Sequence, residues 1–349
     1  MSGEECCSLA EILRDIMRNI YKSLLGIIIS ALFIYLAFRG IDLRLMISYS
    51  SRYHAGPIAL CIIGQLATQI LHWIRWGLIL RRLGQVTWGR VFIMGAIGNA
   101  ALFILPARSG ELVRPTLASR ENEIDFGQAS ATSAIERIAD GLLVSAILFV
   151  SLMAMKKEMA LRSIYYSGLA FLAIILGGSL ILFISNRYQE ASVSVIRRAI
   201  GWLSSQWADR LVRLFNSFIQ GIRLSSDSNI LLPYLGLSII LWGMDIISIY
   251  WLFGTLSHKL PFIAALIVIA ALALGSLVPS GPARLGVFEF AIAYSLGIFS
   301  VGPEEAVLFA TLFHIIAVSL VLVLGILGLW LGRQWLKHSA RNMGKSSLK

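Results

Sequence analysis

The sequence predicts an all-α, polytopic integral membrane protein, and three observations lead to that fold class. Of the 349 residues, 57% are hydrophobic and only 14% are charged, whereas a soluble domain is typically about 45–50% apolar and about 25% charged. The mean hydropathy is +0.78. Apolar runs recur along the whole chain, and several have the roughly 20 residues that a helix needs to cross the hydrocarbon core. These observations exclude a soluble enzyme as the main interpretation.

The charge balance supports the same fold class. The chain carries 30 Lys and Arg residues against 19 Asp and Glu, a net charge of +11. The basic residues gather between the apolar runs, where the positive-inside rule expects them, so we expect no nucleic-acid partner. Cys6 and Cys7 are adjacent in a polar tail and Cys61 falls in an apolar run, a pattern without a disulfide framework. Five scattered histidines indicate no metal site, and we expect no cofactor.

The first half of the chain predicts three spans and one shorter element. The run 23–38 is not followed by the small residues of a signal-peptide cleavage site, so we predict that it is an uncleaved first span. A second span covers 57–80, where Arg75 lies close enough to the end to snorkel. The run 91–106 has only 16 residues and stops at a proline, which favours a re-entrant helix over a full span. The long run 128–155 predicts a bent or broken span.

The second half repeats this order. A span is expected at 165–185, followed by the polar connection 186–229, in which arginines alternate with apolar residues. That alternation is typical of amphipathic helices lying on an anionic leaflet. A further span at 231–256 leads into a tight hairpin whose legs are 262–280 and 284–300. The last span, 305–331, precedes a basic tail.

The basic segments set the expected topology, because Lys and Arg favour the cytoplasmic side. The N-terminal tail, the 80–90 loop, the 186–229 segment and the C-terminal tail are then all cytoplasmic. The run 91–106 and the 262–300 hairpin each return to the side they left. This gives six full spans with two re-entrant elements, or eight spans if both hairpin legs cross. The basic loop 156–162 is an exception that would lie outside.

The domain organisation follows from these elements. We expect a polar tail at 1–18, one transmembrane domain at 19–335 and a basic tail at 336–349. The halves 19–160 and 161–335 share one order of elements, and three spans per half would invert the second half relative to the first. A weak internal correspondence supports the repeat, since Glu111 precedes Arg137 much as Glu289 precedes His314. Inverted repeats with broken helices are a transporter architecture.

Ionisable residues inside apolar segments are costly and mark candidate sites. The first cluster follows Pro106 and includes Arg108, Glu111 and Arg114, with Gly110 allowing a sharp turn. Glu111 lies three residues before Arg114 and is spaced to pair with it on one helical face. The two arginines are suited to phosphate oxygens, because the guanidinium fork matches phosphate geometry. The alternative is an interfacial turn with snorkelling arginines.

The second cluster is Glu136, Arg137 and Asp140, within the apolar run 128–155. Helical spacing puts the two carboxylates on one face. Charges so close together will not face lipid, and Arg108 or Arg114 is the expected partner. A purely structural ion network is the alternative.

The third cluster is the broken segment 278–289, which contains Arg284 and Glu289. Its prolines and glycines leave backbone groups available to a ligand. A lone deep carboxylate such as Glu289 is expected to be protonated or paired across the fold. Asp245 is a secondary candidate for the wall of a cavity. His314 is a secondary candidate as well, although hydrogen-bonded structural roles are favoured for both His314 and His72.

Together the three clusters resemble the transmembrane domain of bacterial lysylphosphatidylglycerol synthases, a flippase-like family. The resemblance spans roughly residues 20–335. It rests on Pro106-x-Arg108-x-Gly110-Glu111-x-x-Arg114, on Glu136-Arg137-x-x-Asp140, and on Pro279 through Gly286-Val287-Phe288-Glu289. One departure is Ala283-Arg284, where the family pattern suggests a more glycine-rich stretch.

The resemblance implies that the protein moves a lipid between the leaflets of the bacterial inner membrane. The clusters would lie near the path of a headgroup that we expect to be anionic. Family members occur alone or fused to a transferase domain. Only about 18 residues follow the last span, so we expect neither aminoacylation nor another enzymatic activity. Two alternatives stay open: a non-transporting partner of a separate glycosyl- or aminoacyl-transferase, and a lipid-modifying enzyme with Glu136, Asp140 or Glu289 as general base.

Overall fold

The structure is a computed structural model of the chain. It describes residues 28–51, 53–121, 123–154, 162–201, 205–225, 228–278 and 280–346. The described residues form helices and short connections, with no strand among them. The all-α prediction is therefore confirmed.

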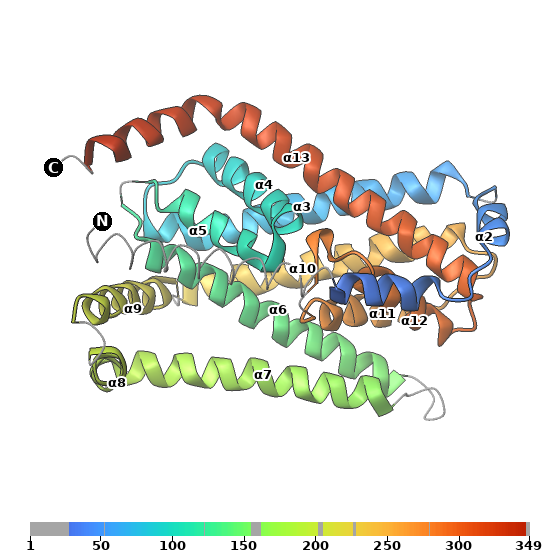
Figure 1. Cartoon of the computed structure of the whole chain (residues 1–349), viewed down its shortest axis with the longest axis horizontal. Coiled ribbons are helices and arrows are strands. Elements are labelled where there is room, and N and C mark those ends of the chain that lie inside the picture. Colours follow the sequence, from blue (N-terminus) through green and yellow to red (C-terminus); the bar gives the residue numbers. More distant parts are fainter. Residues whose placement is uncertain are drawn as a thin grey trace, which may run out of the picture.

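Five long helices lie side by side and form the body of the molecule (Figure 1). Each is long and apolar enough to cross a membrane. This confirms the prediction of a polytopic membrane protein, although the expected first span, 23–38, is described only from its helix Ile28–Phe38 onward. The five are α3 (Ala55–Leu83), α6 (Phe126–Ala154), α7 (Arg162–Arg187), α10 (Ser228–Leu252) and α13 (Pro303–Ser346).

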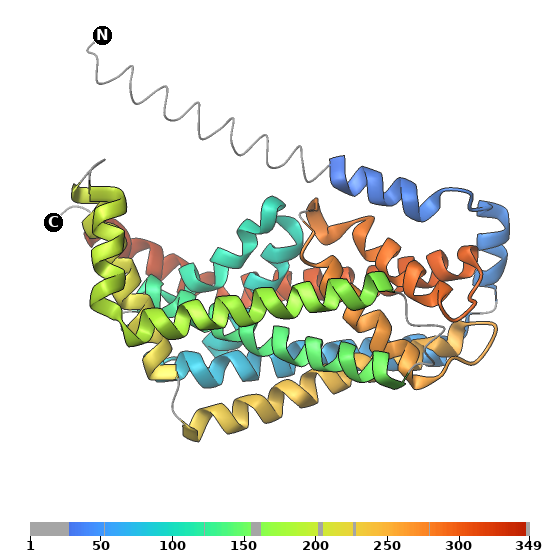
Figure 2. The same ribbon diagram turned by 90° about the horizontal axis from the view of Figure 1, so that it is seen from below.

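A first helical hairpin enters the bundle beside these helices. It consists of α4 (Trp88–Ile104), the 3-10 turn η1 (Pro106–Leu112) and α5 (Val113–Ala118). With 17 residues, α4 is about 26 Å long, which is shorter than the roughly 30 Å hydrocarbon core. The chain turns at η1 and goes back with α5 toward the end of the bundle where α4 began (Figures 1 and 2). This is the geometry expected of a re-entrant element.

A second hairpin enters from the opposite end. It consists of α11 (Phe262–Gly275), the turn η3 (Pro282–Arg284) and α12 (Val287–Gly297). Figure 2 shows both hairpin tips near the middle of the bundle's length, and η3 contacts α4. The two halves therefore send their hairpins in from opposite ends, as an inverted repeat requires. The repeat itself and the domain boundaries at 1–18, 19–335 and 336–349 stay predictions.

Helices α8 (Gln189–Gly201) and α9 (Ser205–Ser225) lie across one end of the bundle. The segment 186–229 forms two helices, as predicted, and that it lies on an anionic leaflet stays a prediction. The apolar face of α9 packs on α6. The close approach depends on two glycines. A Cβ on Gly127 would stand 2.7 Å from the Leu214 carbonyl, and one on Gly221 would stand 2.7 Å from the Gln128 Cα. The apolar face of α9 is thus part of the protein core.

The opposite end carries α2 (Leu43–Ser50), which begins after the capping side chain of Asp42. The largest apolar core lies between α3, α10, α11, α12 and α13, around buried residues such as Ile249, Val268, Ile292 and Phe309. A second core joins α3 to α4, α5 and α6. Both hairpins are therefore packed against the long helices of the bundle, while their tips keep exposed residues such as Leu112 and Leu285.

Candidate functional site

A charged cavity lies where the two hairpin tips meet. Its volume is about 180 Å³, and its lining comes from α3, α4, α5, α6 and η3. Most of the lining groups are polar or charged: Thr68, Gln69, His72, Asn99, Arg114, Glu136, Arg137, Asp140 and Arg284. Residues from all three predicted clusters are thus brought together in one place.

Glu136 is the most deeply buried acid of this cavity, with 2% of its surface exposed. The Arg114 guanidinium stands 2.8 Å from one carboxylate oxygen, and Arg75 stands 3.6 Å from the other. Neither contact has hydrogen-bond alignment, and no described group donates a hydrogen bond to either Glu136 oxygen. Both oxygens are closed off from solvent, so a donor on a ligand would reach this carboxylate where Arg114 moves away from it.

Arg75 is the residue that sequence reasoning placed wrongly. It is fully buried rather than snorkelling, with 0% exposure. Its guanidinium donates to both oxygens of Asp140, at 2.5 and 3.0 Å. It also donates to the Ser238 hydroxyl at 3.1 Å and lies over the Tyr234 ring. A two-pronged Arg–carboxylate contact is strong and directional, so Arg75 turns toward Asp140 instead of toward the membrane surface.

Helix α10 completes the surroundings of Asp140. The Trp242 indole donates to Asp140 Oδ1 at 3.0 Å, so this carboxylate is held from α3 and α10 at once. Neither Arg75 nor Trp242 was predicted from the sequence as part of a functional site. The available signal was Arg75 with His72, three residues apart inside an apolar run.

The rim of the cavity is more open. Arg137 donates to Glu111 at 2.9 Å, and their side chains are 50% and 34% exposed. Glu111 was expected to pair with Arg114, whereas the ion pairs of the structure join Glu111 to Arg137 and Arg114 to Glu136. Arg108 belongs to η1 by its backbone, and its side chain lies outside the described residues.

The charges around the cavity do not balance. Four guanidinium groups stand against three carboxylates among the described residues. The cations are Arg75, Arg114, Arg137 and Arg284, and the anions are Glu111, Glu136 and Asp140. The buried members balance, because Arg75 and Arg114 face Glu136 and Asp140. The excess positive charge comes from the more exposed rim of the cavity, and its field favours an anionic ligand.

Glu289 and His314 lie behind the tip of the second hairpin. Glu289 Oε1 is 2.5 Å from His314 Nδ1, and Oε2 accepts the Gly286 N–H at 2.7 Å. The second contact caps the N-terminus of α12, where a negative charge is favourable. Across the ring, His314 Nε2 is 2.8 Å from the Ala283 carbonyl oxygen. The deep carboxylate is thus paired across the fold, with α13.

The turn that carries Arg284 has an unusual backbone. Ala283 and Arg284 have φ values of 55° and 58°, in the left-handed region that is costly for residues with a Cβ. These are the two positions where the family resemblance suggested glycine, which adopts such angles without strain. Gly286, at φ +84°, touches the first described helix so closely that a Cβ would stand 2.6 Å from Ile34 N.

Asp245 is placed elsewhere. It lies on α10 and accepts a hydrogen bond from Gln65 at 2.6 Å. Gln65 also donates to Ser248 at 2.7 Å, so this polar group ties α3 to α10. Within the described residues no group of three His, Cys, Asp or Glu side chains is arranged to hold a metal ion.

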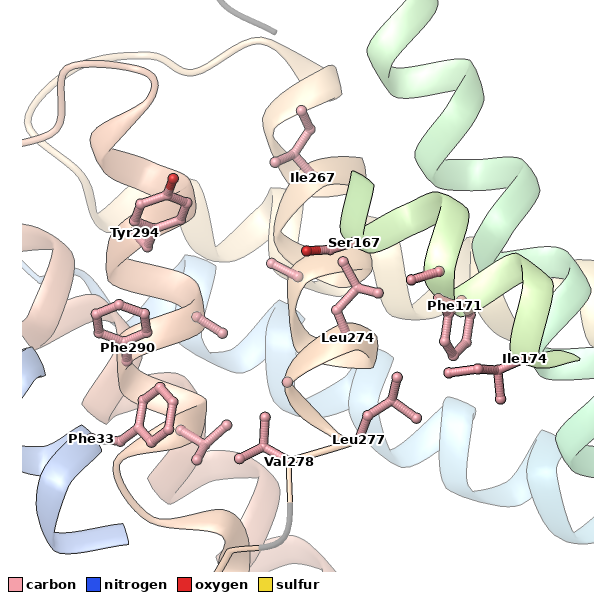
Figure 3. A pocket seen from close by; sticks show the side chains of 15 residues that line it. Phe33, Ser167, Phe171, Ile174, Ile267, Leu274, Leu277, Val278, Phe290 and Tyr294 are labelled. Atoms are coloured by element: carbon pink, nitrogen blue, oxygen red, sulfur yellow. The ribbon is translucent and has the colours of Figure 1, made fainter. Parts of the chain in front are cut away.

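A larger apolar hollow lies beside the hairpin tip. Its volume is about 570 Å³, and its walls are α7, α11, α12 and the helix Ile28–Phe38. Figure 3 shows aromatic and aliphatic side chains around it, including Phe33, Phe171, Leu274 and Phe290. Leu277, Val278 and Val287 line the hollow, and they flank on the chain the same turn that brings Arg284 to the charged cavity.

The fold and the cavity define a class: a multi-pass α-helical membrane protein with a charged site enclosed between two opposed hairpins. The comparison with protein families agrees and is more specific. Residues 23–325 match the family described as "Lysylphosphatidylglycerol synthase TM region", and the chain belongs to that family. A UPF0104 membrane protein of Methanocaldococcus jannaschii is 22% identical over 223 residues, which are 64% of this chain and 89% of that protein. The predicted family is confirmed.

Proposed function

We propose that this protein translocates a phospholipid, or a lipid-linked headgroup, from one leaflet of the membrane to the other. The observation that carries the proposal is the charged cavity at the meeting point of hairpins that enter from opposite ends. Transporters with discontinuous helices bind their substrates at such a point. The family name, which refers to a lipid synthase, supports a lipid as the substrate.

The cavity and the hollow suit the two parts of a lipid. Arg114, Arg137 and Arg284 line the cavity, and guanidinium groups bind phosphate oxygens through paired hydrogen bonds. Glu136, whose oxygens accept no aligned hydrogen bond from the described residues, would accept one from a hydroxyl or ammonium group of the headgroup. The apolar hollow (Figure 3) would hold a hydrocarbon chain. The proposed partner is therefore a membrane lipid with an anionic phosphate and a hydrogen-bond donor.

Headgroup binding need not leave a buried charge uncompensated. If a phosphate takes the Arg114 guanidinium, Glu136 keeps the Arg75 guanidinium at 3.6 Å. Arg75 in turn remains bound to Asp140. The pairs can thus exchange partners while each charge stays compensated, which is what a site opening alternately to either side requires.

The proposal includes an orientation in the bacterial inner membrane. Exposed arginines are found on α8 and α9, for example Arg198 and Arg213. Because basic residues favour the cytoplasmic side, the end of the bundle that carries α8 and α9 would face the cytoplasm. Both chain termini would lie on that side as well.

We also propose that the chain changes the position of the lipid and not its chemistry. A lipid-modifying enzyme would alter the lipid mass, whereas a translocator alters only sidedness. A non-transporting partner of a separate transferase would change neither in a purified system.

The test is a leaflet assay in proteoliposomes that contain the full chain and labelled phosphatidylglycerol. We expect protein-dependent crossing with unchanged lipid mass. Arg284→Gln should slow the crossing about 10- to 100-fold, because a hydrogen bond to a charged group contributes about 1.5–3 kcal/mol. Arg198→Gln on α8 removes one positive charge in the same way but lies away from the cavity. In this variant the lipid should cross at the wild-type rate. No crossing by the wild type, or equal rates in both variants, would contradict the proposal.

A further inference from the structure

The pair Glu289–His314 is not used by the steps described so far. We infer that it is a proton-binding site linked to the headgroup cavity, so that protons move together with the lipid. This inference rests on the proposed function and adds its driving ion. It starts from hydrogen-bond geometry at the two nitrogens of one imidazole ring.

The first nitrogen has a defined state. His314 Nε2 lies 2.8 Å from the Ala283 carbonyl oxygen. A carbonyl oxygen only accepts hydrogen bonds, so Nε2 must carry the hydrogen. The neutral ring with this hydrogen has a lone pair on Nδ1.

The second nitrogen then requires a further proton. His314 Nδ1 lies 2.5 Å from Glu289 Oε1, and two lone pairs cannot face each other at that distance. One proton must lie between them, either on the ring or on the carboxyl group; such a proton belongs to the pair rather than to one residue. With it the pair is neutral, and without it the pair has a charge of −1.

The surroundings isolate this proton. Glu289 and His314 are 5% and 3% exposed, and the Phe288 ring stacks on the imidazole at 4.3 Å. The elements packed around the pair carry these other ionisable groups among the described residues. Helix α11 has none, α12 has Tyr294, η3 has Arg284, and the helix Ile28–Phe38 has Tyr35. Helix α2 has Arg44 and Tyr49, and α4 has Arg90. Helix α3 has Cys61, His72, Arg75, Arg81 and Arg82. Helix α13 has Glu304 and Glu305 at its start and basic groups from Arg333 onward.

The nearest cation along the chain is Arg284, in the turn that the pair holds. His314 binds the carbonyl of Ala283, and Glu289 binds the N–H of Gly286. The left-handed backbone at Ala283 and Arg284 persists only while such contacts over-determine it. The turn is also held by the hydrogen bond from Gly281 N–H to the Ser30 hydroxyl, at 2.8 Å, and by the one from Arg284 N–H to the Gly281 carbonyl, at 3.1 Å.

Loss of the proton changes both the contacts and the charge. The neutral ring then has a single hydrogen, and the carboxylate is the stronger acceptor. With this hydrogen on Nδ1, Nε2 has a lone pair, so the Ala283 carbonyl loses its donor and the turn relaxes. The negative pair then attracts Arg284 away from the cavity. A bound proton therefore keeps Arg284 in the lining of the cavity, where an anionic headgroup would bind, and by reciprocity a bound headgroup favours the bound proton. Proton and anionic lipid should cross in the same direction.

The variant Glu289→Gln separates this role from a structural one. Glutamine can donate to Nδ1 and accept from Gly286 N–H, so it reproduces the protonated pair without a proton to release. We expect it to retain lipid crossing and to lose its dependence on a pH gradient. Asp245→Asn is the matched control, because Asp245 is another carboxylate of a spanning helix, bound to Gln65. In Asp245→Asn, lipid crossing should still depend on the pH gradient.

The experiment uses proteoliposomes of the full chain with labelled phosphatidylglycerol, an internal pH dye and the membrane potential clamped at zero. With one proton per lipid, a gradient of one pH unit should sustain about a tenfold difference of lipid between leaflets, accompanied by proton uptake. Lipid crossing that ignores the gradient and carries no protons overturns this inference and leaves the proposed function standing.

If no lipid crosses, the proposed function fails and the proton site is judged separately. The ¹⁵N signal of His314, assigned by its loss in His314→Gln, is followed against pH in the detergent-solubilised full chain. A pH-dependent shift that disappears in Glu289→Gln and remains in Asp245→Asn supports the proton site. A signal that never moves, or that moves equally in Glu289→Gln, overturns it.

Discussion

At the scale of single residues, the structure is organised by buried arginines and their partners. Arg75 and Asp140 form a two-pronged ion pair across α3 and α6, and Arg114 faces Glu136. Spacing along a helix predicted that Glu136 and Asp140 share a face, and the cavity bears this out. The same reasoning could not find Arg75, because the sequence does not show which way a long side chain turns near the end of a span.

The Arg75–Asp140 pair leads to a prediction about stability. Asp140→Asn leaves the Arg75 charge buried without its anion and should lower the free energy of unfolding by about 3–5 kcal/mol. Glu111→Gln on the exposed rim should lower it by at most about 1 kcal/mol. Unfolding of both variants in detergent, followed by the loss of helical signal, measures the difference. Equal stability of the two variants would show that Arg75 finds compensation elsewhere.

At the scale of elements, the two hairpins position the site, and the sequence predicted both of them. A 16-residue run that stops at Pro106, and a segment broken by prolines and glycines near Arg284, are local signals. The packing of α9 on α6 was not predictable in this way. This packing depends on Gly127 and Gly221, each of which faces particular atoms of the other helix. The hydrophobic periodicity of a single sequence does not show which distant segments contact each other.

The apolar hollow between α7, α11 and α12 gives a prediction at this scale. Ala291 lines the hollow, and Ala291→Trp should fill part of it and slow the crossing of a two-chain phospholipid about tenfold. The expected reason is steric exclusion of one hydrocarbon chain. Ala173→Trp, on an exposed position of α7 outside this lining, is the control and should have little effect. If the lipid crosses at the wild-type rate in Ala291→Trp, the hollow does not belong to the path of the lipid.

At the scale of the whole molecule, helices α8 and α9 lie at one end of the bundle and α2 lies at the other (Figure 1). The basic segment 186–229 predicts that the end with α8 and α9 faces the cytoplasm. The basic loop 156–162, the exception to the rule, falls mostly outside the described residues.

The orientation is tested by labelling introduced cysteines in a background without native cysteine. An impermeant thiol reagent added to intact cells with an opened outer membrane should label Ser48→Cys on α2. It should label Ser194→Cys on α8 only after the inner membrane is permeabilised, because that end carries the exposed arginines. The reverse pattern would invert the proposed topology.

The central claim is that the charged cavity recognises a lipid headgroup through its guanidinium excess and Glu136. The most direct measurement compares the crossing rates of phosphatidylglycerol and phosphatidylcholine in the same proteoliposomes. Phosphatidylglycerol has a net negative charge and hydroxyl donors, whereas phosphatidylcholine has neither. The account predicts that the wild type moves phosphatidylglycerol about tenfold faster or more, and that Arg284→Gln loses most of this preference. Equal rates for the two lipids in the wild type, or an unchanged preference in Arg284→Gln, would contradict it.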